Sequence, residues 1–321
     1  MATPDASVII CTRNRSNIFL ETCDALLAID DGGLSWEIVI VDNASTDETP
    51  EAALSLSKRS PQPVKLAREM TLGLSTARNT GIQMATGRAI VFLDDDAIPW
   101  HNWLPLLVDG LDREGVYAAG GPVEPRFASD LPAWFSDRFL PYLTVWDLGP
   151  EVIELQYNEY PRGANMAFRR EAFDRFGLFS THLGRKAKSL LSCEETELCL
   201  RIERGGGSIV YVPGAGVDHL VEGGRVTQPW LRRRFRAQGT SEAIVEWQHA
   251  GFTGLAIGMW RSLSRTLHSR RLRQPDHQVV RQCELAATWG YLAGLIRAPL
   301  TVPRYRARPE AGPPIQWRPF R

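Results

Sequence analysis

Three consecutive carboxylates, Asp94-Asp95-Asp96, follow the apolar run Ala89–Leu93. Like charges this close repel one another, so the arrangement costs stability unless a cation is held there. Alternate residues of an extended segment point the same way, which allows Asp94 and Asp96 to face one ligand. Carboxylate oxygens prefer Mg²⁺ or Mn²⁺, and such ions are usually held together with substrate phosphates. The alternative is a solvated acidic turn that caps a helix around Trp100–Val108.

A second acidic group, Glu194-Glu195, lies near the start of a predicted helix, Cys193–Arg204. An alcohol is a poor nucleophile until a base removes its proton, and a carboxylate is a suitable base. Ser192 and Glu195 also have the spacing of a capping box, in which Glu195 accepts a hydrogen bond from the Ser192 backbone. Capping contributes only about 1 kcal/mol. Loss of a base costs about 100- to 10,000-fold in rate, so mutation separates the two interpretations.

The elements that position these groups alternate between strand and helix. The predicted strands are Ser7–Cys11, Glu37–Val41 and Ala89–Leu93, and the predicted helices are Phe19–Ile29, Thr49–Ser57 and Leu74–Ala85. Strands this uniformly apolar are typical of a parallel sheet covered on both faces. The pattern therefore predicts an α/β fold with a doubly wound sheet. Ligands of such sheets bind at the carboxyl ends of the strands. The polar clusters after the three strands therefore predict one shared site.

The rest of the chain divides by composition. We expect residues 1–120 and 121–224 to form two halves of one domain, followed by a helical extension at 225–300 and a Pro/Arg-rich tail at 301–321. The extension is predicted to contain helices at Trp230–Gln248, Gly258–Arg273 and Val279–Arg297. Residues 1–224 carry 20 Lys+Arg against 32 Asp+Glu, whereas residues 225–321 carry 17 Arg against 5 Asp+Glu. This basic end suits phosphates or an anionic lipid surface, or docks on the acidic part.

The five cysteines show no zinc-ligand spacing, which indicates reduced thiols. We expect neither a signal peptide nor a membrane-spanning helix, and hence a cytoplasmic protein that is peripheral to the membrane if it binds there. No recognition module accompanies the basic end, so nucleic-acid binding is not expected. A dinucleotide oxidoreductase needs a glycine-rich turn after the first strand, and CTRNRS contains no glycine.

Five segments resemble, in order, the blocks of family 2 glycosyltransferases with the GT-A fold: SVIICTRNR, EIVIVDNASTDET, GLSTARNTGIQMATGRAIVFLDDD, RGANMAFRREAF and CEETELCLRIERGGGSIVYVPGAGVDH. The likeness covers roughly Ser7 to Phe235. It implies transfer of one sugar from a nucleoside-diphosphate sugar, with inversion and a divalent metal (Mn²⁺ or Mg²⁺). The acceptor would be a saccharide, a lipid-linked saccharide or a small molecule. A catalytically inactive sugar- or nucleotide-binding protein is the alternative.

The resemblance also implies roles for single residues. The nucleotide-sugar would contact Thr12, Arg13, Arg15, Asp42, Gly73, Arg78, Asp94 and Asp95. Asp96 and His219 would bind the metal, and Glu195 would take the place of the family's catalytic Asp, with Glu194 as the other candidate base.

Each of these roles has a structural alternative. Asp42 suits a local turn, Arg78 an ion pair with Asp94, and a lone histidine such as His219 is more often structural. Gly163 and Asn165 are predicted to contact the acceptor, because a small residue allows close approach and an amide both donates and accepts. An ordinary strand-entry turn is the alternative for this pair. The C-terminal helices are expected to contact a membrane, to form a homodimer interface or to pack on the core.

Overall fold

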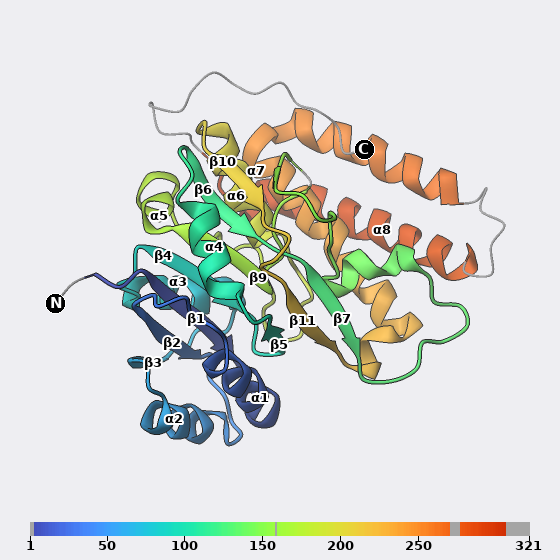
Figure 1. The fold of residues 1–321 in the computed structure, drawn as a ribbon. Coiled ribbons are helices and arrows are strands. Elements are labelled where there is room, and N and C mark those ends of the chain that lie inside the picture. Colours follow the sequence, from blue (N-terminus) through green and yellow to red (C-terminus); the bar gives the residue numbers. More distant parts are fainter. Residues whose placement is uncertain (1–2, 158, 270–276, 306–321) are drawn as a thin grey trace.

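The computed structural model describes residues 3–157, 159–269 and 277–305 of the chain. The strands are β1 Ala6–Thr12, β2 Trp36–Asp42, β3 Val64–Arg68, β4 Ala89–Leu93, β5 Ala97–Pro99, β6 Val116–Gly120, β7 Val123–Phe127, β8 Ile153–Glu154, β9 Asn165–Arg169, β10 Ser208–Tyr211 and β11 Val217–Val221 (Figure 1). The α-helices are α1 Ser16–Leu27, α2 Thr49–Arg59, α3 Leu74–Met84, α4 Trp103–Leu111, α5 Arg170–Phe176, α6 Glu194–Arg204, α7 Gln228–Ser269 and α8 His277–Thr301. Two short 3₁₀ helices, η1 Asp137–Leu143 and η2 Gly223–Val226, complete the set.

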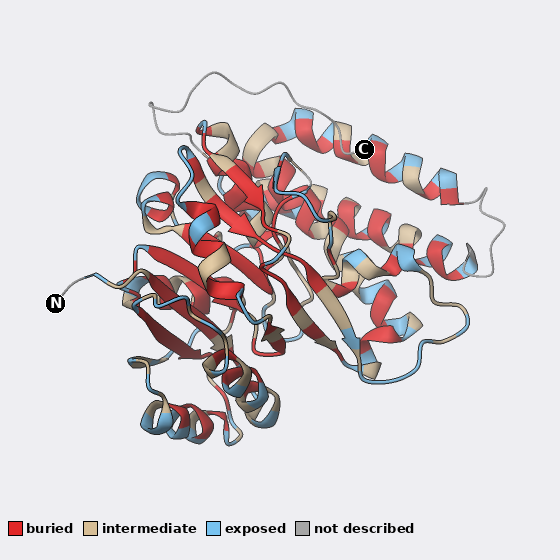
Figure 2. Ribbon diagram, viewed as in Figure 1, coloured by how far each residue is buried: buried red, intermediate tan, exposed pale blue. Residues whose placement is uncertain are grey.

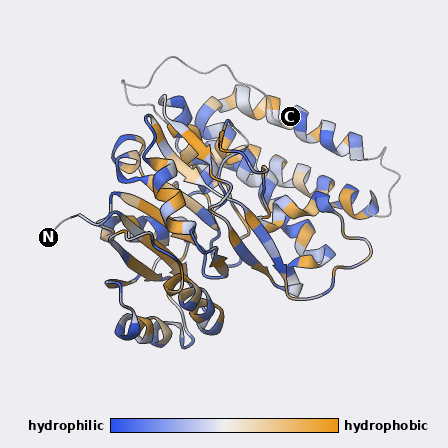
Figure 3. Ribbon diagram, viewed as in Figure 1, coloured by the Kyte–Doolittle hydropathy of each residue, from blue (hydrophilic) through white to orange (hydrophobic). Residues whose placement is uncertain are grey.

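An eight-stranded mixed sheet forms the centre of the molecule, in the order β3-β2-β1-β4-β9-β6-β10-β8. Strands β3, β2, β1 and β4 are parallel, and β9 is antiparallel to both of its neighbours. All residues of β2 and β4 are buried, which explains the apolar runs at 38–41 and 89–93 (Figures 2 and 3). The three predicted strands and the α/β class are confirmed. Strand β3 was not predicted, because this partly exposed edge strand alternates apolar and basic residues.

The sheet places the polar clusters on one edge. Thr12 and Asp42 are register partners at the carboxyl ends of β1 and β2, and the acidic triplet follows the neighbouring strand β4. A second, three-stranded sheet has the order β5-β11-β7. In it, His219 pairs with Ala97, and Leu220 N–H donates to the Asp96 carbonyl at 2.8 Å. This backbone pairing brings a histidine more than a hundred residues away beside the acidic triplet.

The C-terminal extension is helical, as predicted, and lies on the opposite side of the molecule from α1 and α2 (Figure 1). The helix α7 is interrupted at Gly251, which has a left-handed φ of 61°. Ion pairs between Glu246 and Arg261 and between Glu242 and Arg265 show that the second part of α7 folds back on the first. Residues 270–273 of one predicted helix, and the predicted tail from residue 306, lie outside the described residues.

Candidate functional site

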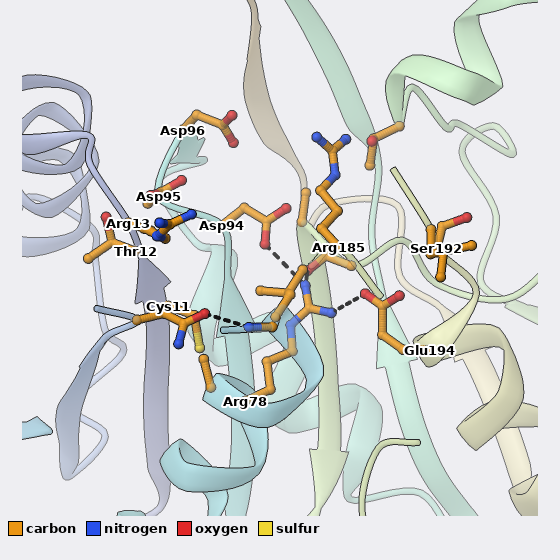
Figure 4. A pocket seen from close by; sticks show the side chains of 18 of the residues that line it. Cys11, Thr12, Arg13, Arg78, Asp94, Asp95, Asp96, Arg185, Ser192 and Glu194 are labelled. Atoms are coloured by element: carbon orange, nitrogen blue, oxygen red, sulfur yellow. Dashed lines mark hydrogen bonds and ion pairs between the residues drawn. The ribbon is translucent and has the colours of Figure 1, made fainter. Parts of the chain in front are cut away.

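A cavity of about 230 Å³ opens at the carboxyl edge of the central sheet (Figure 4). Most of the predicted site residues line it: Thr12, Arg13, Arg15, Gly73, Arg78, Asp94, Asp95, Asp96, Gly163, Glu194, Glu195 and His219. Asp42 and Asn165 are not among its lining residues. Chain segments far apart in the sequence thus contribute to one concave site, which is the usual form of a ligand pocket.

Asp94, Asp96 and His219 form a cluster whose potential ligand atoms all lie within 4.8 Å of one another. The Asp94 side chain is 29% exposed, toward the cavity, whereas Asp96 and His219 are almost completely buried. His219 Nε2 lies 3.3 Å from Asp96 Oδ1, and the buried Nδ1 has no hydrogen-bond partner. Two carboxylates and an imidazole make a donor set that suits Mn²⁺.

The charge on Asp96 is compensated by cationic side chains. Arg15 Nη1 lies 2.5 Å and Arg225 Nη2 lies 3.1 Å from Asp96 Oδ2. Burial alone would raise the pKa of Asp96, but His219, Arg225 and Arg15 together hold it well below its usual value. Burial raises the pKa of the neighbouring Asp95 to about 7 despite the nearby Arg15 guanidinium. This point of the cavity therefore requires positive charge, which an arginine or a metal ion can supply.

Arg78 connects Asp94, which follows β4, to Glu194 on the helix α6 (Figure 4). Its guanidinium is 2% exposed and donates to Glu194 Oε1 at 2.6 Å, Asp94 Oδ1 at 3.1 Å and the Gly163 carbonyl at 2.9 Å. The ion pair with Asp94 that the sequence suggested is therefore present. A side chain at position 163 would begin only 2.8 Å from Arg78 Nη2, so glycine makes room for the guanidinium.

The two candidate bases differ in their surroundings. Glu194 is buried and ion-paired with Arg78, whereas the Oε2 of Glu195 has no hydrogen-bond partner among the residues that the structure describes. Burial, and next the charge of Glu194, raise the pKa of Glu195 to about 8. The capping box is wrong: α6 has no side-chain cap, and the Ser192 N–H donates to Ser241 Oγ instead. The described contacts therefore give the Glu195 carboxylate no structural role.

Thr12 and Asp42 occupy the ends of the first two strands and carry buried oxygens without a hydrogen-bond partner. These atoms are Thr12 Oγ1 and Asp42 Oδ2, the second lying 3.3 Å from the Arg68 guanidinium in an ion pair. The other Asp42 oxygen accepts from the Ser45 N–H, so the predicted turn interaction exists as well. Buried acceptors are normally satisfied, so Thr12 Oγ1, whose residue lines the cavity, is suited to accept from a ligand, whereas Asp42 lies behind the cavity wall and already has a cationic partner.

Asn165 does not fit the predicted contact with an acceptor. It is fully buried, and its amide nitrogen donates to the carbonyls of Pro122 and Ala215. Its Oδ1 accepts from the Trp103 indole N–H at 2.8 Å. The amide joins β9 to α4 and to the segments before β7 and β11, which leaves no polar group for a ligand. The sequence showed that the Asn165 amide can both donate and accept hydrogen bonds. It did not show that the amide uses them all within the fold.

Arg185, Ser192 and Arg234 also line the cavity; the sequence indicated Ser192 only as a helix cap and did not single out Arg185. Arg234 belongs to the basic C-terminal end, which the sequence predicted to suit phosphates, and lies on α7 in a run with Arg232, Arg233 and Arg236. The structure separates this run, because Arg232, Arg233 and Arg236 are exposed while Arg234 lines the cavity. The signal available for Arg185 was a basic loop, Arg185 to Lys188, shortly before the acidic pair.

The architecture defines the class of protein. The solved structure of the mannosyltransferase PcManGT from Pyrobaculum calidifontis, in complex with GDP-Man and Mn²⁺, matches with a TM-score of 0.60 and 20% identity, covering 92% of this chain and 88% of that one. GalNAc-T7 with UDP, GalNAc and Mn²⁺ matches with a TM-score of 0.55 and 16% identity, over 94% of this chain and 58% of that one. The fold is that of the GT-A glycosyltransferases.

The family follows from the sequence comparison. A model of glycosyl transferase family 2 matches residues 7–177, more than half of the chain, and the protein belongs to that family. A glucosyl-dolichyl phosphate glucuronosyltransferase of Haloferax volcanii is 29% identical over 245 residues, 75% of this chain and 77% of its own. The succinoglycan biosynthesis protein ExoM of Rhizobium meliloti is 28% identical over 240 residues, 74% of each. The protein is therefore a glycosyltransferase, and a purely binding role is not supported.

Proposed function

We propose that this enzyme transfers one sugar, with inversion, from a nucleoside-diphosphate sugar to a hydroxyl group of an acceptor. The observation that carries the proposal is the meeting, in one cavity, of a cation-ligand set with an unpartnered carboxylate. Asp94, Asp96 and His219 form the ligand set, and Glu195 is the carboxylate. Inverting transfer needs both: a positive group for the leaving diphosphate and a base for the attacking hydroxyl.

Asp94, Asp96 and His219 would hold a divalent ion, with Mn²⁺ favoured because imidazole is a softer ligand than oxygen. When bound, such an ion offsets the negative charge that grows on the departing diphosphate. The three side chains fit a divalent ion. The buried His219 Nδ1 has no hydrogen-bond partner among the described residues, and Asp96 is already ion-paired with positive side chains. The two GT-A structures above contain Mn²⁺ together with their nucleotides.

The donor base would lie between the ends of β1 and β2. Thr12 Oγ1 and Asp42 Oδ2 are buried acceptors without a hydrogen-bond partner, and a base N–H would satisfy one of them. Arg13 is exposed at the same edge, where it can reach the nucleotide. Asp94 and Gly73 line the cavity farther along, which suits contact with the ribose and the phosphates.

Glu195 is the proposed base that takes the proton of the acceptor hydroxyl. Glu194 is the weaker candidate because its carboxylate already neutralises Arg78. For the acceptor we propose a lipid-linked saccharide, the class named for the Haloferax relative. Donor hydrolysis and transfer, measured with and without Mn²⁺, test the proposal. Hydrolysis that is unaffected by chelator, or the absence of any nucleotide binding, would contradict it.

A peripheral contact of the C-terminal helices with a membrane is part of the proposal, because their acidic groups face inward. All three acidic residues in the described parts of α7 and α8 are ion-paired with arginines of α7; these are Glu242, Glu246 and Glu284. Apolar side chains point outward instead: Phe252, Trp260, Leu263 and Leu267 on α7, and Trp289, Ile296 and Leu300 on α8, are each 47–80% exposed. This distribution is the reverse of that in a water-exposed helical hairpin.

The exposed arginines on these helices make an anionic lipid surface the fitting partner: Arg232, Arg233, Arg236, Arg281 and Arg297. Their surface carries no exposed carboxylate among the residues described. None of the helices within the described ranges is long and apolar enough to cross a bilayer. We therefore propose that the helices lie in the plane of the interface, with their tryptophans at headgroup level.

Vesicle sedimentation tests this contact. The protein should pellet with phosphatidylglycerol vesicles more than with phosphatidylcholine vesicles, and Trp260→Glu with Trp289→Glu should abolish pelleting. Leu54→Glu is the matched control, since Leu54 is an exposed apolar residue on the distant helix α2. A dimer in sedimentation velocity that the double variant dissociates, without any pelleting of wild type, would contradict the proposal.

A further inference from the structure

The cavity contains more positive charge than its own acidic groups balance. Six arginines line it (Arg13, Arg15, Arg78, Arg185, Arg225 and Arg234), against five carboxylates (Asp94, Asp95, Asp96, Glu194 and Glu195). The formal excess is one positive charge, and a bound divalent ion would increase it to three. Because each phosphodiester carries one negative charge, the diphosphate of a sugar nucleotide supplies about two. About one positive charge remains after the donor has bound.

The arginines differ in how far they are already neutralised. Arg78 is ion-paired with Glu194 and Asp94, Arg15 with Asp95 and Asp96, and Arg225 with Asp96. No carboxylate pairs with Arg185 or Arg234 in the part of the chain that the structure describes. Arg13 has no described ion pair either, but it is exposed at the end of β1, where the donor base is proposed to lie. Arg185 and Arg234 therefore carry the excess charge in the rest of the cavity.

The contacts of Arg185 and Arg234 indicate an open anion position. The Arg185 guanidinium forms no hydrogen bond to any described residue. Burial and the repulsion of Arg225 and Arg234 lower its pKa to about 10. Among the described residues, Arg234 donates to the neutral Gln238 amide alone, at 2.9 Å, and it lies over the Tyr142 ring. The charges of Asp96 and Asp94 offset this repulsion only in part, so a ligand that neutralises the two arginines should bind well.

This position lies on the acceptor side of the cavity. The Arg185 side chain extends between Asp94 and Ser192, away from the β1 end where Thr12 and Arg13 lie (Figure 4). Ser192 hydrogen-bonds through its hydroxyl to the same Gln238 that accepts from Arg234. The pair therefore lies where the loop before α6 meets α7, beside the start of the helix that carries the proposed base, Glu195.

We propose that Arg185 and Arg234 bind a phosphate group of the acceptor, separately from the donor diphosphate. The inference rests on the proposed function and narrows the acceptor to phosphate-bearing molecules, of which a prenyl-phosphate-linked saccharide is one. Two guanidinium groups offer paired donors that match phosphate oxygens in charge and geometry. The phosphate would hold the acceptor so that its hydroxyl is presented to Glu195.

Calorimetry with farnesyl phosphate as the probe tests the proposal on the full chain, with and without UDP or GDP and Mn²⁺. Wild type should bind the probe, and Arg185→Gln and Arg234→Gln should each weaken binding by about 10- to 100-fold, the effect of losing a charge-assisted hydrogen bond. Nucleotide affinity should change less than about threefold. Arg113→Gln, at an exposed position just after α4 and outside the cavity, is the matched control and should bind both ligands normally.

Two outcomes would overturn the inference. If the variants lose nucleotide affinity and keep that for farnesyl phosphate, the arginines serve the donor diphosphate. If neither affinity changes, they bind no phosphate. Failure of wild type to bind any nucleotide with Mn²⁺ is a different result: it refutes the proposed function, while the probe measured without nucleotide still tests the arginines. Thermal unfolding of each variant shows whether it is folded, and Arg185→Gln should not be less stable, since Arg185 has no described partner to lose.

Discussion

Replacement of Glu195 by glutamine tests the assignment of the base most directly. The substitution keeps the size of the side chain and removes its ability to accept a proton. Loss of a general base typically slows a reaction by about 100- to 10,000-fold, which corresponds to about 3–5 kcal/mol of transition-state stabilisation. We expect the transfer rate to fall within this range, while nucleotide affinity stays near that of wild type, because Glu195 belongs to the proposed acceptor side of the cavity, on α6 rather than at the ends of β1 and β2.

The same substitution should not destabilise the protein. The pKa of Glu195 is raised from 4.5 to about 8, so between these values the folded protein binds more protons than the unfolded chain. Stability therefore falls as the pH rises through this window. At pH 7 the penalty is at most about 3 kcal/mol, from about 1.4 kcal/mol per pKa unit, and solvent access from the cavity reduces it. Glutamine removes the penalty, so Glu195→Gln should be as stable as wild type or more stable.

Glu194→Gln is the matched control, because it makes the same change one residue away. Glu194 is ion-paired with the buried Arg78, so this variant should lose about 1–3 kcal/mol of stability. Urea unfolding at pH 7, together with single-turnover transfer rates, measures both effects. A near-normal rate in Glu195→Gln would remove this residue from the mechanism. If Glu195→Gln loses about 1 kcal/mol of unfolding free energy, the result would support a helix-capping role for Glu195, which the structure does not show.

The remaining predictions concern the metal, the central arginine and the pH profile. Asp96→Ala, or chelation of wild type, should lower nucleoside-diphosphate affinity more than about tenfold in calorimetry, because the ion would join protein and diphosphate; affinity that is indifferent to both refutes the metal site. Arg78→Ala should cost about 3–5 kcal/mol in urea unfolding, since it leaves Glu194 buried without its cation; an unchanged midpoint would show that this pair is unimportant. The rate at limiting acceptor should rise with pH toward about 8, as Glu195 loses its proton. A flat profile from pH 6 to 9 would argue against Glu195 as the base, and Glu195→Asp should keep part of the rate because it retains the carboxylate.

Local sequence was sufficient for much of the fold. Strands β1, β2 and β4 were predicted because strands buried on both faces need unbroken apolar residues. The grouping of polar residues at one edge followed, because parallel strands end on the same side of a sheet. Strand β3 was missed because a partly exposed edge strand has no such constraint.

The candidate site was only partly predictable. The acidic triplet, the two glutamates and His219 were recognised by residue type and spacing, and all of them line the cavity. Their separate tasks were not recognisable, because these depend on partners distant in the chain. Arg78 selects Glu194 as its ion-pair partner across more than a hundred residues, and this choice leaves Glu195 free.

By itself the sequence determined which chemical groups are present and which strands carry them to one edge. Only the tertiary structure decided which of these groups are already satisfied. It turned Asn165 inward to three partners in the fold and left Arg185 without any described partner. The reason is physical: hydrogen bonds and ion pairs depend on distances of a few ångströms between segments that the order of residues does not bring together.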